Sequence, residues 1–97
     1  MTRLLLIAAT LVAALCLPTA ATAVVPPKNC GTMTVKGKRY QVKADQISCS
    51  TGRDHTKRYL ERRRKPRGYT CKDVSKARNS LTFRCNNGRK TFFAIRR

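Results

Sequence analysis

Acidic and proton-transferring residues are scarce in this chain of 97 residues. It contains four Asp and Glu residues, one histidine and no tryptophan, and most of the titratable groups stand singly among cations. General acid–base catalysis needs such groups in mutual reach, whereas His55 and Glu61 would lie on different sides of a helix. No glycine-rich phosphate loop, serine elbow or metal-ligand motif is present. The sequence therefore predicts a protein that is not an enzyme and that needs no metal or other cofactor.

The first 23 residues carry a single charge, Arg3, and are typical of an export signal. An apolar run of 14 residues, Leu4–Leu17, precedes Pro18 and a small-residue stretch that suits signal-peptidase cleavage after Ala23. A membrane anchor is the alternative, but 14 helical residues span only about 21 Å of a hydrocarbon core of roughly 30 Å. We therefore expect a secreted protein with a signal peptide at 1–23, an extended leader at 24–29 and one domain at 30–97.

Four cysteines follow the export signal: Cys30, Cys49, Cys71 and Cys85. An even number of cysteines in a small exported chain predicts two disulfides. A zinc site is the alternative, but zinc ligands usually come in pairs about two to four residues apart. These cysteines are separated by 19, 22 and 14 residues. We favour pairing Cys30 with Cys49 and Cys71 with Cys85, while a bridge between Cys49 and Cys85 stays open.

Apolar and polar residues alternate from Thr32 to Ala44, and this pattern predicts a β-hairpin. A two-residue type II′ turn at Gly37-Lys38 would set Val35 opposite Tyr40 and Met33 opposite Val42. This register places every apolar residue of the hairpin on one face.

Residues 49–64 form the only segment of the mature chain with a helical pattern. Ser48 or Ser50 can cap its start, and Pro66 helps to end it. Gly52 lowers the helix propensity by roughly 1 kcal/mol relative to Ala, which favours a close approach of the helix to a sheet at this residue. The expected buried stripe consists of Cys49, Gly52, Thr56, Tyr59, Leu60 and the stem of Arg63.

Three further strands are predicted at Tyr69–Val74, Leu81–Cys85 and Thr91–Ile95. The last turn has two candidate registers. A two-residue Asn87-Gly88 turn would set Phe83 opposite Phe92. A three-residue loop at 86–88 would instead direct Phe92 outward and bury more apolar surface, and we favour it. Its apolar face would consist of Leu81, Phe83, Cys85, Phe93 and Ile95.

These elements predict an α+β domain of order β-β-α-β-β-β, with one antiparallel sheet, a single helix on one face and two disulfides. The segments Val42-x-Ala44-x-x-Ile47-Ser48-Cys49, Gly68-Tyr69-x-Cys71 and Cys85-x-x-Gly88 resemble a small cysteine-stapled module. That module occurs in exported proteins of high-GC Gram-positive bacteria and has no assigned activity. The resemblance covers about residues 30–95 and implies this fold rather than a function.

Positive charge dominates the mature chain. Arg3 is the only basic residue before position 24, so residues 24–97 hold 21 of the 22 Lys and Arg and all four carboxylates, a net charge of +17. Solubility needs a net charge of only about 2 to 8 on a small domain. Denser like charges destabilise the compact state unless a partner neutralises them. The sequence therefore predicts an anionic partner: a nucleic acid, a phosphate-rich wall polymer, an anionic glycan or an anionic membrane surface.

Two surfaces are expected to bind this partner. One is the basic run around the helix end, and the other is the uncovered sheet face, where an outward aromatic ring could stack on bases or sugars. The candidate polyanion-binding residues are Arg58, Arg62, Arg63, Arg64, Lys65 and Arg67 near the helix end and Lys36, Arg39, Lys43, Arg84, Lys90 and Phe92 on the sheet.

We therefore expect a secreted, monomeric, non-enzymatic module that binds an anionic polymer or surface. Three alternatives stay open. A cationic antimicrobial or toxin-like membrane-active protein would need a broad exposed apolar helix face, which Tyr59 and Leu60 alone do not supply. A small secreted ribonuclease would use His55. A protease inhibitor or substrate would present residues 62–65 as a trypsin-like site on an exposed loop.

Overall fold

A computed structural model describes residues 26–97, and the export signal predicted at 1–23 lies outside the described residues. The elements are β1 (Lys28–Val35), β2 (Lys38–Asp45), α1 (Cys49–Arg62), β3 (Thr70–Asp73), β4 (Leu81–Asn87) and β5 (Lys90–Arg96). The strands pair antiparallel throughout, in the order β1-β2-β5-β4-β3. The predicted α+β fold of order β-β-α-β-β-β is therefore confirmed.

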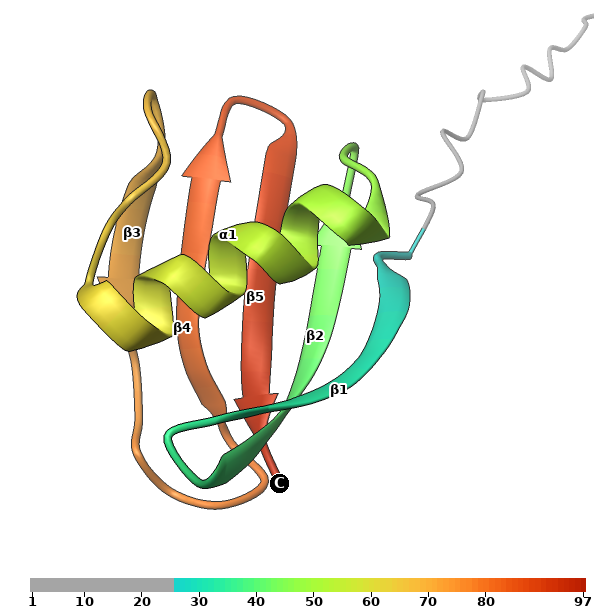
Figure 1. The fold of residues 1–97 in the computed structure, drawn as a ribbon. Helices are drawn as coiled ribbons and strands as arrows, with labels where there is room; N and C mark the ends of the chain where they lie inside the picture. Colours follow the sequence, from blue (N-terminus) through green and yellow to red (C-terminus); the bar gives the residue numbers. More distant parts are fainter. Residues whose placement is uncertain (1–25) are drawn as a thin grey trace, which may run out of the picture.

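The core lies between α1 and one face of the sheet. Figure 1 shows the helix crossing the sheet, with its C-terminal end beside β3, while no second layer of the described chain covers the other face. Gly52, Thr56 and Tyr59 are buried on the helix at the expected spacing. The buried apolar residues are Val35, Tyr40, Val42, Ala44, Tyr59, Phe83, Cys85, Phe92 and Ala94.

Both ends of α1 have local caps. The Ser48 Oγ accepts a hydrogen bond from the Thr51 backbone N–H at 3.1 Å, which satisfies one of the free donors of the first turn. The helix ends at Arg62, earlier than expected, because Arg63 adopts a left-handed conformation with φ 57°. At Gly52 a Cβ would come within 3.0 Å of the Ala44 Cβ, which confirms the close approach of helix and sheet.

The predicted register of the first hairpin is wrong by two residues. Its turn is Lys36-Gly37, with φ 53° and 79°, and Met33 pairs with Tyr40. Positive φ at both turn residues is characteristic of a type I′ turn, whose twist suits a hairpin. Because the shift is two residues, the apolar side chains keep the face that was expected. The strand also begins at Lys28, inside the stretch 24–29 expected as a leader.

The favoured register of the last hairpin is also wrong. A two-residue turn at Gly88-Arg89 joins β4 to β5, and Cys85 pairs with Phe92. Gly88 supplies the positive φ of 61° at the first turn position, as in a type II′ turn. Phe92 therefore points to the helix and is fully buried, in contrast to the expected outward position. The alternative register came closer, since Phe83 and Phe92 do share a face.

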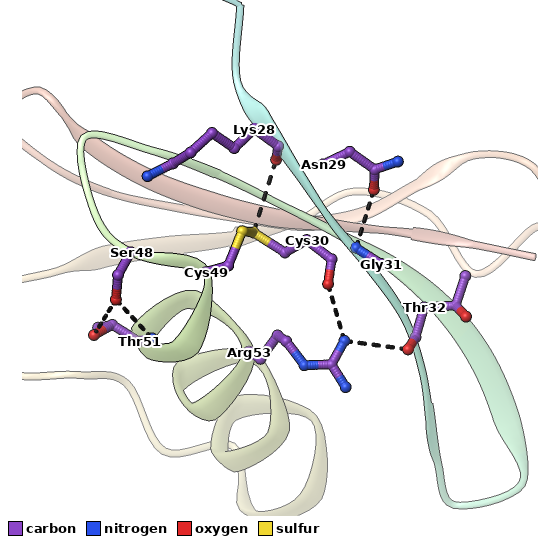
Figure 2. The surroundings of a disulfide bond; sticks show 9 residues. All are labelled: Lys28, Asn29, Cys30, Gly31, Thr32, Ser48, Cys49, Thr51 and Arg53. Carbon is purple, nitrogen blue, oxygen red and sulfur yellow. Dashed lines mark hydrogen bonds between the residues drawn. A yellow bond between two sulfur atoms is a disulfide. The ribbon is translucent and has the colours of Figure 1, made fainter.

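The two predicted disulfides, Cys30–Cys49 and Cys71–Cys85, are both present. The first joins β1 to the start of α1 (Figure 2). Nearby, Arg53 Nη1 donates hydrogen bonds to the backbone carbonyl oxygens of Cys30 at 3.0 Å and Thr32 at 3.2 Å. The helix is thus fastened to the edge strand by a covalent bond and by a charged side chain. The second disulfide links two residues that lie opposite each other on β3 and β4.

Candidate polyanion interface

Few of the cations are neutralised within the molecule. Residues 26–97 include 21 Lys and Arg side chains and four carboxylates, and only two ion pairs join them. Arg58 pairs with Asp54 at 3.4 Å, and Arg63 pairs with Asp73. All four side chains are more than half exposed, so water also screens these pairs. In the described chain, 19 cations therefore have no ion-pair partner.

The first candidate surface lies at the C-terminal end of α1. After the helix the chain passes Arg64 and Lys65 and turns at Pro66, whose carbonyl oxygen accepts the Tyr69 N–H at 3.1 Å. A hollow of about 230 Å³ opens here. We call it the helix-end surface, and it is lined by His55, Arg58, Arg64, Lys65, Pro66 and Arg67. Four of the six helix-end cations predicted from the sequence thus lie around one hollow, and Arg62 is exposed on the last turn of the helix.

Arg63 has a different place from its neighbours in the basic run. Its backbone N–H donates to the Tyr59 carbonyl oxygen at 2.9 Å, and its guanidinium lies 4.6 Å from the centre of the Tyr59 ring. The same guanidinium binds Asp73, which also accepts a hydrogen bond from the Tyr59 hydroxyl at 2.7 Å. Hydrogen bonds from Arg63 and then from Tyr59 hold the pKa of Asp73 below its ordinary value. Arg63 therefore joins the helix end to β3, and its charge is already partnered.

His55 packs into the floor of the helix-end surface. Its ring centre lies 5.6 Å from that of Tyr69 and 5.3 Å from that of Phe92. Burial lowers the pKa of His55 below 6.5, which Asp54 opposes and Arg58 reinforces. Burial therefore favours the neutral imidazole, which presents an aromatic ring rather than a charge among the surrounding cations.

The second candidate surface is the uncovered face of the sheet. The strand registers place Lys43 beside Phe93, Phe93 beside Arg84, and Arg84 beside Lys72. We call these four residues the outer row; they come from β2, β5, β4 and β3. Neighbouring strands lie about 4.8 Å apart, so the row extends over about 14 Å. The Arg84 guanidinium lies 5.5 Å from the centre of the Phe93 ring. The row thus combines three cations with one half-buried aromatic ring.

Part of the predicted sheet site is not on this face. Phe92 lies in the core, and Phe93 takes the outward position that we had expected for Phe92. Lys90 alternates in phase with Phe92 and so lies on the helix side, and Lys36 lies in the first hairpin turn. Lys43 and Arg84 are placed as expected, and Arg39, which pairs with Thr34, shares their face. The sequence does contain a signal for a buried Phe92, because the segment Thr91–Ile95 has apolar residues on both faces.

Two further features of residues 26–97 bear on the function. No helix there is long and apolar enough to cross a membrane. That part of the chain also holds no group of three or more His, Cys, Asp or Glu side chains arranged to bind a metal ion. No protein-family model, curated protein or solved structure matches the chain, so its resemblance to the exported cysteine-stapled module stays a prediction.

Proposed function

We propose that this protein is a secreted, non-enzymatic binding module that holds an anionic polymer on the outer row and the helix-end surface. The observation that carries the proposal is the shortage of internal counter-charge, with 19 of the 21 cations of residues 26–97 outside any ion pair. Unneutralised cations at this density repel one another, and a polyanion relieves that repulsion. Binding also releases the counterions condensed on the polymer, which adds to the affinity.

The arrangement of the two surfaces supports an extended ligand. The outer row ends at Lys72 on β3, and the helix end lies beside the same strand (Figure 1). A flexible chain that follows the outer row can therefore pass the β3 edge and reach the helix-end cations. Both surfaces rest on elements that disulfides hold, since Cys71–Cys85 joins β3 to β4 and Cys30–Cys49 fastens α1. Such a scaffold loses little conformational entropy when it binds.

The test is a salt series of binding to single-stranded DNA, a sulfated glycan and a phosphate-rich wall polymer. The logarithm of the affinity should fall linearly with the logarithm of the salt concentration, by about 0.7 to 0.9 per neutralised phosphate. One variant changes the outer row to Gln at Lys43, Lys72 and Arg84. A second changes the helix-end residues Arg64, Lys65 and Arg67 to Gln. Arg63 is left intact because it fastens the helix end to β3.

The matched control removes three exposed cations outside both surfaces, by Lys28→Gln, Lys57→Gln and Arg89→Gln. We expect both surface variants to bind more weakly than this control and to show a shallower salt dependence. Equal losses in all three variants would mean that only net charge matters and would contradict the proposed surfaces. Absence of binding to all three polymers at low salt would contradict the proposed function itself.

A further inference from the structure

A second cationic hollow lies away from the outer row and the helix-end surface. It has a volume of about 250 Å³ and opens between the first hairpin turn, the C-terminal ends of α1 and β5, and the β3–β4 connection. We call it the turn pocket. Its cationic lining consists of Lys36, Lys38, Arg63, Lys76 and Arg96, and none of the residues within 26–97 that line it carries a carboxylate.

The strand registers bring these cations together. Tyr40 on β2 is directly opposite Arg96 on β5, so the Arg96 side chain lies on the helix side of the sheet with Tyr40. Lys38 precedes Tyr40 by two residues and shares this face. The Lys36-Gly37 turn adds Lys36 at the rim. The pocket therefore depends on the observed type I′ turn, which sets Lys38 opposite Val35.

Two polar atoms in the lining are buried and have no hydrogen-bond partner among the described residues. They are the Thr82 Oγ1 and the Arg96 Nε. Buried polar groups of this kind are normally satisfied, and an exception commonly has an ordered water or an ion as its partner. An Arg Nε–H can only donate, and a hydroxyl can also donate, so an ion that satisfied both atoms would be an anion.

The nearest carboxylate does not supply that acceptor. Asp73 lines an adjoining hollow that shares Arg63, Lys76 and Thr82 with the turn pocket. Its two oxygens accept hydrogen bonds from the Tyr59 hydroxyl and the Arg63 guanidinium. The other four cations of the pocket form no ion pair within residues 26–97; they are Lys36, Lys38, Lys76 and Arg96. The pocket thus has an excess of donors and of positive charge.

We propose that the turn pocket binds one phosphate group. Its volume of about 250 Å³ has room for one phosphate group. A phosphate carries up to two negative charges and accepts several charge-assisted hydrogen bonds from Lys, Arg and hydroxyl donors. The source is free phosphate or a phosphate at the end of a bound polymer. The site stands apart from the proposed polymer surfaces and does not require them.

The first test titrates the whole folded protein with inorganic phosphate at constant ionic strength, using chloride to compensate. Calorimetry should give a saturable one-to-one isotherm, and the Arg96 Nε–H resonance should shift with the same midpoint. The combined change Lys38→Gln, Lys76→Gln and Arg96→Gln should weaken phosphate binding at least tenfold. The control with Lys28, Lys57 and Arg89 changed to Gln loses the same charge and should weaken it less than twofold.

A second variant removes a donor without changing the charge. Thr82→Val should weaken phosphate binding at least threefold, and because the hydroxyl has no partner it should not lower the melting temperature in phosphate-free buffer. Equal weakening by the pocket and control variants would overturn the site, as would a phosphate titration that does not saturate. Indifference of phosphate affinity to Thr82→Val would overturn the assigned donor.

An oligonucleotide pair with and without a 5′-phosphate identifies the source of the group. If a polymer end binds the pocket, the phosphorylated member binds more tightly, and the pocket variants abolish only that difference. If free phosphate is the ligand, the two oligonucleotides bind alike while inorganic phosphate still saturates. Loss of all polymer binding with retained phosphate binding would contradict the proposed function but still support the phosphate site in the turn pocket.

Discussion

Asp73 is the residue at which the helix end and the sheet are joined electrostatically. Its pKa is lowered in the folded protein, so its contribution is complete above the pKa of the unfolded chain, about 3.9, and is lost as the pH falls through the lower folded value. We predict that Asp73→Asn lowers the free energy of unfolding at pH 7 by at most about 1 kcal/mol, because the Arg63–Asp73 pair is largely exposed. The difference from the wild type should shrink below about pH 4.

Urea unfolding of both proteins at pH 7, 5, 4, 3 and 2 measures this difference. The amide introduced by Asp73→Asn keeps one acceptor oxygen and can still accept a hydrogen bond from the Tyr59 hydroxyl, while the charge and the hydrogen bond from Arg63 are lost together. The matched control is Asp54→Asn, which removes the ion pair of Arg58 within one helix. A difference that stays constant over the whole pH range would show that the Asp73 charge does not stabilise the fold.

Phe93 is the only aromatic side chain in the outer row. Stacking of a base on an aromatic ring contributes about 1–3 kcal/mol, and it needs no particular base. We predict that Phe93→Leu weakens binding of a single-stranded oligonucleotide by about that amount per stacked base and leaves the affinity for polyphosphate, which has no rings, unchanged. Fluorescence anisotropy with both ligands at one salt concentration measures the two effects. Equal losses for both ligands would contradict stacking on Phe93.

Single residues also show where prediction from the sequence stops. The positive charge of the run 62–67 and its place at a helix end were predicted, and the structure has them. The left-handed conformation of Arg63 was not, because a non-glycine residue tolerates it only when tertiary contacts compensate the strain. Here those contacts come from Tyr59, one helical turn earlier, and from Asp73, which lies on another element, β3. The sequence therefore predicted where the cations lie, but not that Arg63 is already paired with Asp73.

At the scale of the element, the cap of α1 decides where the helix begins. Ser48 and Ser50 were both candidates, and only the Ser48 Oγ accepts the Thr51 N–H. We predict that Ser48→Ala lowers the free energy of unfolding by about 0.5–2 kcal/mol, since the first turn then loses a hydrogen-bond acceptor. Ser50→Ala, an exposed change inside the helix, should alter the stability by less than about 0.5 kcal/mol. Chemical denaturation compares the two, and similar losses would contradict the cap.

The periodicity of the sequence was sufficient for the type and order of the elements, while the turns needed tertiary information. Residues at alternating and helical spacing predicted the hairpins and the stripe Gly52, Thr56 and Tyr59. The prediction of the first turn was wrong because Lys36 takes a positive φ that its residue type disfavours. The prediction of the last turn was wrong because one apolar face was assumed for Thr91–Ile95, although β5 is the central strand. Each error shifted the predicted strand register, and the second also placed Phe92 on the surface instead of in the core.

At the scale of the whole molecule, disulfides and charge act in opposite directions. Each bridge reduces the entropy of the unfolded chain by closing a loop of 19 or 14 residues. Such loops stabilise a fold by about 3 kcal/mol each in the loop-closure model. A domain of this size has a small core, and a net charge of +17 works against its compaction. The bridges therefore allow the cations to stay unneutralised on a folded scaffold.

This balance predicts that salt stabilises the protein. Mutual repulsion among 21 cations is screened as ionic strength rises, because the Debye length falls from about 30 Å at 0.01 M to about 10 Å at 0.1 M. The melting temperature should therefore increase between 10 and 150 mM sodium chloride. The control with Lys28, Lys57 and Arg89 changed to Gln should melt higher at low salt and gain less from added salt, because fewer cations repel one another. A melting temperature that is independent of salt, or falls with it, would show that the unneutralised cations do not strain the fold. The argument that a polyanion relieves such strain would then lose its basis.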